Sequence, residues 1–386
     1  MSSPVFLPGS TIGILGGGQL GRMLTIVAKR MGYRVVSWVG APDTGPAGLA
    51  DVVIEESFDS AAGLSQFLAE ADVATVEFEN IPKALLETIT AQLPLHPGAE
   101  AITIGQHRER EKNFLSENGI PCANYAVVDS SESLALALQH LPDNGGILKT
   151  AEFGYDGKGQ LPVTANDDAS LIWADFEAPR AVLEEKIDLA AELSVLVARG
   201  TNGKTITYDP AENIHRDHIL DLSILPARLD KAILDEAEAI ALRVADALNY
   251  VGILAVEFFV SGDGRLLVNE MAPRPHNSGH HTLDACVTSQ FEQQLRTICG
   301  LPPGAPTLTR AVVMLNLLGD VWVDADGKPD WASILALPGT ALHLYGKAEA
   351  RRGRKMGHLN LTAENVDEAL ALQDKCRAIL KIPARD

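Results

Sequence analysis

Cysteine, aromatic residues and long apolar runs are all scarce in this sequence. The 386 residues include four cysteines, no two of which form a CxxC pair, and 5% aromatic residues. Neither a disulfide framework nor a zinc knuckle is therefore expected, and a reducing, cytoplasmic location is the prediction. No apolar run reaches the roughly 18 residues of a spanning helix, so no membrane association is predicted. The opening MSSPVFLPGS lacks the basic and apolar regions of a signal peptide, so none is expected.

Positive charge is in deficit as well. The chain has 32 lysines and arginines against 51 aspartates and glutamates, which gives a net charge of -19. Because a nucleic-acid backbone needs a basic surface, nucleic acid is not an expected partner. On so acidic a chain a local basic cluster is informative, and the clearest one is KAEARRGRK at residues 347–355. The length predicts two or three domains, with enough apolar content for more than one core.

The N-terminal part alternates strands and helices as a parallel α/β sheet does. The expected elements are strand Thr11–Leu15, a glycine-rich turn at 16–21, helix Arg22–Met31 and strand Tyr33–Val39. Gly16, Gly18 and Gly21 match GxGxxG, a turn that aims the N–H groups of a helix N-terminus at a phosphate. The second strand ends in Val39 and Gly40 instead of the acid that would bind an adenosine ribose, so NAD is not expected. We expect a phosphate or ribose of another ligand; the alternative is a tight turn without a ligand.

The same sheet should continue beyond these elements. Further strands are expected at Asp51–Glu55, Val73–Phe78 and Leu93–His96, with helices at Ala61–Glu70 and Lys83–Gln92. Glu77 and Glu79 close one of these strands at the edge where such sheets bind ligands. We favour a functional role for Glu77, which should lie near the glycine-rich turn. For Glu79, ordinary solvation of a strand end explains the residue equally well.

A hairpin later in the chain carries two acids on apolar strands. Its strands are expected at Ile253–Val260 and Arg265–Glu270, around the turn SGDG. If Val260 pairs with Arg265, Glu257 lies opposite Val268, and Glu270 becomes its diagonal neighbour about 7–8 Å away. Oxygen ligands suit Mg²⁺, so the pair predicts a metal-nucleotide site; the alternative is solvation of one acid at a sheet edge. The residues that follow and strengthen the metal-nucleotide hypothesis are Arg274, His276, Asn277 and His280.

A second glycine-rich segment is a candidate for phosphate binding. The expected strand Gly146–Lys149 ends in a lysine, and FGYDGKGQ follows at residues 153–160. Backbone N–H groups of such a loop wrap phosphate oxygens, although the GxxxxGK[ST] spacing is absent. A surface hairpin would have a similar sequence, and Lys149 decides in favour of phosphate.

The remaining expected elements lie on either side of that hairpin. Helices are expected at Lys112–Asn118, Ser131–Gln139, Lys231–Ala247, Ser289–Cys299 and within Thr362–Ala378, and strands at Tyr125–Val128, Ala181–Ile187, Glu192–Ala198, Thr205–Tyr208, Val312–Leu317 and Gly339–Leu344. The run LPPG at residues 301–304 has the composition of a linker.

Four motifs together resemble one family. GGGQLGRM (16–23), GYDGKGQ (154–160), NEMAPRPHNSGH (269–280) and GRKMGHLN (353–360) are similar to those of 5-(carboxyamino)imidazole ribonucleotide synthases, which are ATP-grasp enzymes. The resemblance spans nearly the whole chain. It implies an α/β fold, α+β in part, with a Rossmann-like parallel-sheet domain at 1–107. An ATP-grasp domain would follow at 108–300, with a mobile lid at about 120–185, and a small C-terminal domain at 301–386. A homodimer is implied as well.

The resemblance also implies a reaction. ATP would drive the carboxylation of 5-aminoimidazole ribonucleotide by bicarbonate through carboxyphosphate, with ADP and phosphate as by-products, in purine biosynthesis. ATP and Mg²⁺ would be the cofactors, and the ribonucleotide and bicarbonate would be the small-molecule partners. The alternative is another ATP-grasp carboxylase that acts on a different acid and amine.

Site residues follow from the matching positions. The metal ligands would be Glu257 and Glu270, and the catalytic residues Arg274, His276, Asn277 and Lys355. The ribonucleotide would contact Gly18, Gln19, Leu20, Glu77, Tyr155, Lys347, Arg354 and Lys355. ATP would contact Arg108, Lys112, Lys149, Gly154, Tyr155, Asp156, Gly157, Lys158, Gly159, Gln160, Glu184, Glu185, Lys186, Ile187, Glu192, His215, Asn269 and Glu270.

Two positions depart from the family pattern. Ala151, Glu152 and Phe153 stand where a basic residue often precedes GYDGKG, so Glu152 should point away from the triphosphate. Ala272 stands where many ATP-grasp enzymes have an asparagine, so phosphate oxygens and water would complete the metal shell.

Overall fold

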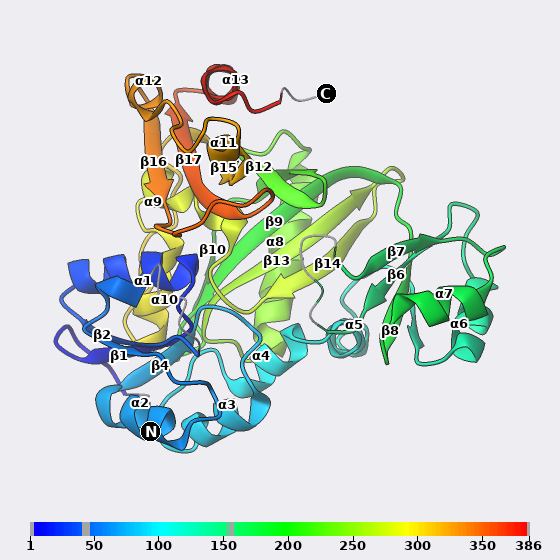
Figure 1. Cartoon of the computed structure of the whole chain (residues 1–386), viewed down its shortest axis with the longest axis horizontal. Helices are drawn as coiled ribbons and strands as arrows, with labels where there is room; N and C mark the ends of the chain where they lie inside the picture. Colours follow the sequence, from blue (N-terminus) through cyan, green and yellow to red (C-terminus); the bar gives the residue numbers. More distant parts are fainter. Residues whose placement is uncertain (1–3, 41–46, 153, 155–157, 384–386) are drawn as a thin grey trace.

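The structure of the chain, a computed structural model, describes residues 4–40, 47–152, 154 and 158–383 (Figure 1). In these ranges the strands form one parallel and two antiparallel sheets. No helix in the same ranges is long and apolar enough to cross a membrane. The combination of helices with one parallel and two antiparallel sheets agrees with the α/β class, α+β in part, that was expected from the sequence.

The N-terminal part is a parallel sheet in the order β3-β2-β1-β4. Its strands are β1 (Thr11–Leu15), β2 (Arg34–Trp38), β3 (Val52–Ile54) and β4 (Val73–Val76), and its helices are α1 (Gln19–Arg30), η1 (Ala47–Leu49), α2 (Ala61–Glu70), α3 (Lys83–Thr90) and α4 (Ala99–Gly105). The strand predicted at Leu93–His96 is reduced to one bridge between Ala74 and Leu95. Pro94 and Pro97 lack the N–H groups that a longer ladder needs.

A small antiparallel sheet follows, in the order β5-β8-β6-β7. The elements are α5 (Arg108–Glu117), β5 (Tyr125–Val128), α6 (Ser131–Leu138), β6 (Gly146–Thr150), β7 (Gln160–Val163), α7 (Ala169–Phe176) and β8 (Ala181–Glu185). Helices α6 and α7 pack on one face, where Val128, Leu134, Leu148 and Leu183 form a separate core. Figure 1 shows this part set off to one side of the molecule.

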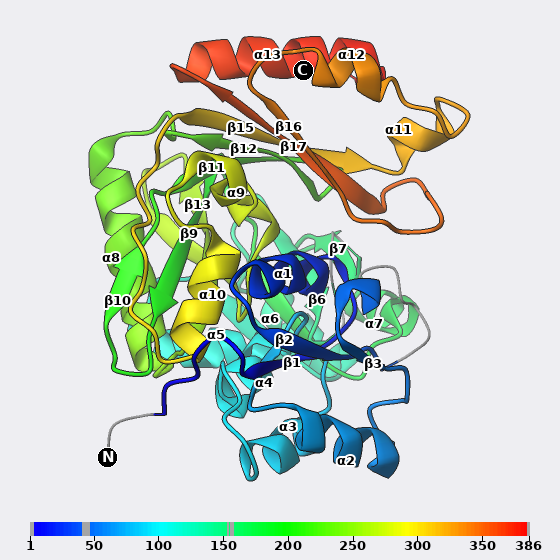
Figure 2. The ribbon, with the colours of Figure 1, turned by 90° about the vertical axis from the view of Figure 1, so that its left-hand side faces the viewer.

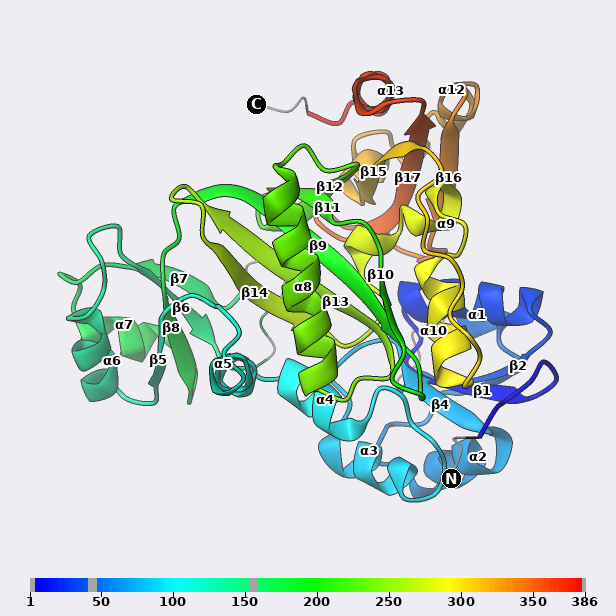
Figure 3. The same ribbon diagram turned by 180° about the vertical axis from the view of Figure 1, so that it is seen from behind.

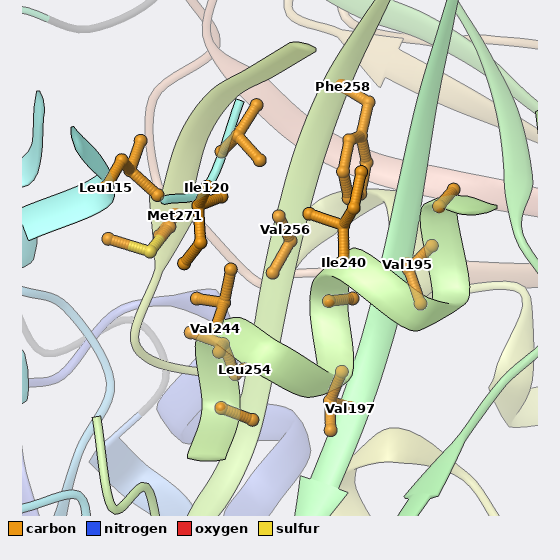
Figure 4. Close-up of a cluster of buried hydrophobic side chains, with 14 of the residues drawn as sticks. Leu115, Ile120, Val195, Val197, Ile240, Val244, Leu254, Val256, Phe258 and Met271 are labelled. Atoms are coloured by element: carbon orange, nitrogen blue, oxygen red, sulfur yellow. The ribbon is translucent and has the colours of Figure 1, made fainter. Parts of the chain in front are cut away.

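The largest sheet has nine strands in the described residues, in the order β14-β13-β9-β11-β12-β15-β17-β16 with β10 beside β9. Its first strands and helix are β9 (Leu189–Arg199), β10 (Thr205–Thr207), β11 (Ala211–Arg216), β12 (Ile219–Leu225), α8 (Lys231–Ala247), β13 (Gly252–Ser261) and β14 (Leu266–Ala272). Helix α8 lies across the β9–β13 face (Figure 3). Figure 4 shows Ile240 and Val244 of α8 against Val195, Val256 and Phe258, which form the main core.

The register of the β13–β14 hairpin differs from the expected one. Val260 pairs with Leu266, and a β-bulge lies between Glu257 and Phe258. Glu257 and Glu270 are consequently direct cross-strand partners, so the predicted diagonal arrangement is wrong. The bulge adds one residue to one strand and shifts the ladder beyond it, which a turn-based register does not reveal.

The last part of the chain extends the same sheet. It contains η2 (Asn277–Gly279), α9 (Thr282–Ala285), α10 (Gln290–Ile298), β15 (Ala311–Leu318), α11 (Asp320–Val323), α12 (Trp331–Leu335), β16 (Thr340–Leu344), β17 (Lys355–Ala363) and α13 (Val366–Leu380). Strand β15 pairs with β12, so the ladder runs on without a break. Figure 2 shows α12 and α13 above β16 and β17. The three-domain division stays a prediction.

Candidate active site

A cavity of about 510 Å³ lies where these parts meet. Residues from the N-terminal part, α5, the β6–β7 connection, the central sheet and β17 line it. The predicted site residues among its walls are Arg108, Lys149, Gly154, Gln160, Glu192, His215, Glu257, Asn269, Glu270, Arg274, His276, Asn277 and Lys355. Three of the four motifs that resemble one family therefore converge on one cavity, and the first, at residues 16–23, contributes no residue to its lining.

Paired carboxylates form one wall. Glu257 and Glu270 face each other across the β13–β14 ladder. Burial, with the adjacent charge of Glu270, raises the pKa of Glu257 to about 8. The Glu257 side chain is mostly buried, whereas that of Glu270 is partly exposed and lies 3.7 Å from Arg108. Two acids this close repel each other unless a cation compensates their charge, and carboxylate oxygens are ligands that Mg²⁺ uses. No group of three or more histidine, cysteine or acidic side chains that could hold a metal occurs among the described residues. Phosphate oxygens and water would have to complete any metal shell here.

A histidine adjoins the acid pair. Nε2 of His276 lies 3.3 Å from a carboxylate oxygen of Glu257. Nδ1 of the ring lies 2.9 Å from Ser278 Oγ and 3.4 Å from the Ser278 nitrogen, so Ser278 orients the ring with Nε2 toward Glu257. Burial, followed by the nearby charge of Arg274, holds the pKa of His276 well below its usual value. His276 is therefore a neutral hydrogen-bonding group at this wall.

Two buried lysines share one buried glutamate, and of these three residues only Lys149 lines the cavity. Lys112 and Lys149 lie 3.3 and 3.0 Å from the Glu184 carboxylate, and Lys112 also donates to the Asn269 carbonyl at 3.0 Å. Burial alone would raise the pKa of Glu184, but the two ammonium groups outweigh it and lower that pKa to about 2. Two cations against one anion leave a net positive charge, which suits a polyphosphate.

Glu111 is a wall residue that the sequence did not single out. Its carboxylate accepts the Met271 N–H at 2.5 Å, directly after Glu270, and burial raises its pKa to about 7. In the sequence it stands within RERE at residues 108–111, a pattern typical of a solvated helix face. Only the tertiary contact with β14 reveals it.

Arg274 is paired across the boundary with the N-terminal part. Its guanidinium donates to both carboxylate oxygens of Glu79, at 2.5 and 3.0 Å. Burial opposes the charge of Glu79, yet the bidentate contact with Arg274 lowers the pKa of that carboxyl. The role of Glu79, which the sequence left open, is thus to bind the arginine that was expected to hold a small anion.

The predicted ribose and adenine residues lie around β8 and β9. Glu192 contacts Nδ1 of His215 at 3.0 Å; burial lowers the pKa of His215, but this contact outweighs it and raises that pKa. The Glu185 carboxylate accepts from Asn124, and the Lys186 carbonyl accepts from Asn144 at 2.7 Å. Glu185, Lys186 and Ile187 are not among the residues that line the cavity.

The phosphate-loop prediction is only partly covered by the described residues. Gly154 and Gln160 line the cavity, whereas Lys158 and Gly159 do not. Tyr155, Asp156 and Gly157 lie outside the described residues. Glu152 lies 3.8 Å from His107, a contact consistent with the expectation that it points away from the phosphates.

The first glycine-rich turn contains a protein carboxylate. Gly18 and Gly21 donate their N–H groups to the two oxygens of Glu77, at 2.5 and 2.8 Å. A Cβ on Gly18 would lie 2.6 Å from Glu77 Oε1, so the glycine makes room for this acid. The chain's own carboxylate stands where a phosphate or ribose was expected.

The basic cluster approaches that turn. Nζ of Lys347 donates to Gln19 Oε1 and to the Lys355 carbonyl, each at 2.7 Å. Leu20, the residue after Gln19 in α1, is buried. Within the basic cluster, Arg354 donates to the Glu349 carbonyl at 2.8 Å. Segments more than 300 positions apart are brought together, as the substrate prediction requires.

Comparison with known proteins defines the class first. The ATP-grasp domain family matches residues 113–291. The ribonucleotide synthetase preATP-grasp domain matches residues 10–106, and the phosphoribosylaminoimidazole carboxylase C-terminal domain matches residues 312–372. The chain is thus an ATP-grasp enzyme with the domain types of a purine-synthesis ligase.

Full-length relatives then define the family. N5-carboxyaminoimidazole ribonucleotide synthase of Bacillus subtilis (strain 168) is 42% identical over 95% of both chains. The enzyme of that name from Brucella melitensis is 43% identical over 91% of this chain and 96% of its own. The chain belongs to the N5-carboxyaminoimidazole ribonucleotide synthase family.

Solved structures agree with that assignment. An ADP complex of an N5-carboxyaminoimidazole ribonucleotide synthetase has a TM-score of 0.92, with 40% identity over 98% of this chain and 99% of its own. The Aspergillus clavatus synthase in complex with ADP and 5-aminoimidazole ribonucleotide has a TM-score of 0.87, with 28% identity over 97% and 99% of the two chains. The predicted family and ATP-grasp fold are confirmed.

Proposed function

We propose that the chain converts 5-aminoimidazole ribonucleotide to N5-carboxyaminoimidazole ribonucleotide, with bicarbonate as the carbon source and ATP converted to ADP and phosphate. The observation that carries the proposal is the convergence of Lys149, the Glu257–Glu270 pair, Arg274 and Lys355 on one cavity. Family membership supports the substrate, because a relative is described as a complex with ADP and 5-aminoimidazole ribonucleotide.

Two steps account for the reaction. The γ-phosphoryl group of ATP passes to a bicarbonate oxygen, which gives ADP and carboxyphosphate. The exocyclic amine of the ribonucleotide then attacks the carboxyl carbon, the C–O bond to phosphate breaks, phosphate leaves with the electron pair, and the amine loses a proton. Because phosphoryl transfer needs positioning and charge neutralisation more than covalent help, the residues act mainly as cations and donors.

ATP would bind between the small sheet and the large sheet. Lys112 and Lys149 would neutralise phosphate oxygens, with Glu184 fixing both ammonium groups. The Glu257–Glu270 pair would hold Mg²⁺, which would neutralise further phosphate charge, and a cation there would relieve the repulsion of the two carboxylates. The remaining proposed contacts to ATP are Arg108, Gly154–Gln160, Glu184–Ile187, Glu192, His215 and Asn269.

Bicarbonate and carboxyphosphate would lie beside the acid pair. Arg274 would bind the planar anion with the guanidinium edge that remains outside its contact with Glu79, and His276 would donate from Nε2. Asn277 has both side-chain polar atoms buried without a partner, so it has hydrogen-bonding capacity for this ligand.

The ribonucleotide would bind between α1 and β17. Gln19 and Leu20 would contact it, and Lys347, Arg354 and Lys355 would bind its phosphate. Gly18 and Glu77 would act by shaping the turn that presents Gln19, since the two oxygens of Glu77 accept from that turn. A cytoplasmic homodimer remains a prediction, supported by the family resemblance and the four free cysteines.

The deciding experiment measures phosphate release from ATP with bicarbonate and Mg²⁺, with and without 5-aminoimidazole ribonucleotide. We expect the ribonucleotide to stimulate turnover, a carboxylated ribonucleotide to form, and chelation of Mg²⁺ to abolish both. The proposal is refuted if the ribonucleotide leaves phosphate release unchanged and no carboxylated product forms. Turnover with another amine but not with this ribonucleotide would favour a different ATP-grasp carboxylase.

A further inference from the structure

A buried polar cluster joins two segments that are far apart in the sequence. One is the loop at 276–281, which carries His276 at the cavity wall. The other is β17, which begins with Lys355 at the same cavity. His280 of the loop meets His358 and Asn360 of β17 where the two segments are in contact, and all three are fully buried. None of these three contacts the cavity, so the proposed chemistry does not account for them.

The contacts within the cluster are directional. The Asn360 side-chain amide donates to the His280 carbonyl at 2.9 Å and to Asp284 Oδ2 at 2.6 Å. The rings of His280 and His358 lie 4.7 Å apart, and His358 Nδ1 lies 2.9 Å from the Tyr345 hydroxyl. Each contact joins β17 to the loop or to α9, or orients a ring that packs against the loop.

A third histidine completes the stack. His343 of β16 pairs with His358 of β17, and their rings are stacked at 4.5 Å with an interplanar angle of 8°. Nε2 of His343 lies 2.7 Å from the same Asp284 oxygen that Asn360 contacts. Asp284 therefore ties the two strands of the hairpin to α9.

Side-chain alternation along β17 separates this cluster from the core. Leu359 and Leu361 point into the apolar core under α13. His358 and Asn360 point to the other face, toward the loop. One face of β17 thus packs in the apolar core, and the other contacts the loop. Substitutions can therefore change one face without changing the other.

Stability alone does not explain the polar face. His280 Nε2, His358 Nε2 and Asn360 Oδ1 are buried without a partner, and each such atom is destabilising because its desolvation is not compensated by a hydrogen bond. Apolar side chains would pack here without that cost. Hydrogen bonds constrain direction and distance in a way that apolar contacts do not, which suits a role in fixing one geometry.

We propose that His280, His358 and Asn360 are positioning residues that fix β17, and with it Lys355, against the loop that carries His276. The inference rests on the proposed function for its substrate. It explains why the motifs NEMAPRPHNSGH and GRKMGHLN occur together: each supplies a cavity residue and, four or three positions later, a histidine of the cluster. The phosphate end of the ribonucleotide site is then held in register with the site of carboxyl transfer.

The test uses the full-length enzyme and separates the two substrates. His358→Leu keeps the volume and removes the hydrogen bond and the ring stack. We expect the KM for 5-aminoimidazole ribonucleotide to rise about tenfold, and the Kd for ADP to stay within about twofold. His358→Asn keeps a polar atom near Tyr345. Its KM for the ribonucleotide should therefore rise less than that of His358→Leu. Equal increases in both constants, or an unchanged KM, would overturn the proposal.

Controls distinguish positioning from general weakening of the fold. Leu361→Val lowers stability from the other face of β17, and it should leave the KM for the ribonucleotide unchanged; an increase equal to that of His358→Leu counts against the proposal. If His358→Leu does not fold, Tyr345→Phe removes only the hydroxyl at His358 and should raise this KM about threefold. An unchanged KM in that variant refutes the proposal.

A measurement without substrate separates this inference from the proposed function. Hydrogen exchange should become faster at residues 353–358 and also at 276–281 in His358→Leu, because the cluster couples the two segments. Faster exchange in β17 alone would contradict the coupling. Failure of wild-type enzyme to use the ribonucleotide would refute the function, while the exchange result would still decide the coupling.

Discussion

At the scale of single residues, the glutamates around the site have different partners and therefore different structural roles. Glu77 shapes a turn through two N–H groups, Glu79 binds Arg274, and Glu184 holds two lysines. Glu257 faces another acid and has a raised pKa, whereas Glu184 has a lowered one. The sequence identified Glu257 and Glu184 through the hairpin and the family motifs. It could not identify Glu111, because the contact that buries it comes from a distant strand.

Glu184 predicts a pH dependence of stability. Its folded-state pKa of about 2 is below the ordinary value of 4.5, so the stabilisation is complete above pH 4.5 and is lost as the pH falls toward 2. Glu184→Gln should lower the free energy of unfolding by about 3 kcal/mol at pH 7, because two lysines lose their partner. Its unfolding free energy should also depend less on pH between 4.5 and 2 than that of the wild type.

Urea unfolding at a series of pH values measures both effects. Glu132→Gln on the exposed start of α6 is a matched control and should behave as wild type. A wild-type pH slope in Glu184→Gln would show that Glu184 does not cause the acid sensitivity.

At the scale of elements, helices and turns were easier to predict than strand register. Helix α8 has the predicted bounds Lys231–Ala247, since its apolar residues recur with the helical period. Strand β12 was not predicted, because it follows a turn at Asp217 and His218 in which both residues have positive φ and which contains no glycine. The bulge between Glu257 and Phe258 could not be predicted either, because one added residue does not produce a recognisable change in the alternation of apolar and polar residues.

The glycine-rich turn gives a prediction at this scale. Gly18→Ala places a Cβ against Glu77, although the Gly18 φ of -81° suits any residue, so the cost is steric. We expect a loss of about 1–3 kcal/mol in unfolding free energy, and a smaller loss when Glu77→Ala is already present. Gly98→Ala is the control, because a Cβ there meets nothing within 4 Å.

Urea unfolding of the two single variants and the double variant measures the coupling. Additive losses would mean that the glycine and the acid are independent, and that Gly18 is needed for another reason.

At the scale of the whole molecule, the central sheet determines the architecture. Strands from residue 189 to residue 363 form one ladder, and the last of them bring Lys355 to the cavity. The sequence predicted the three parts in order, since each has its own motif. It could not show that the linker-like LPPG run separates strands of a single sheet, because strand neighbours are set by tertiary pairing.

Removal of residues 310–386 tests that continuity. The truncated chain would expose the edge of β12 together with Leu222 and Ile224, which the C-terminal core now covers. We expect it to aggregate and to bind ADP more weakly than the full-length chain. Ile224→Lys in the truncated chain should reduce aggregation, as size-exclusion chromatography would show. A monomeric truncated chain with full-length affinity for ADP would mean that the C-terminal strands form an independent unit.

The carboxylate in the first glycine-rich turn also affects competition among nucleotides. A group carried by the same chain acts on its neighbours at an effective concentration that is commonly in the millimolar range or above. A dissolved phosphate or dinucleotide would have to displace Glu77 from two hydrogen bonds before it could use this turn. Changes in the concentrations of free adenylates would therefore act on the enzyme through the cavity of the central sheet and leave the N-terminal turn unaffected.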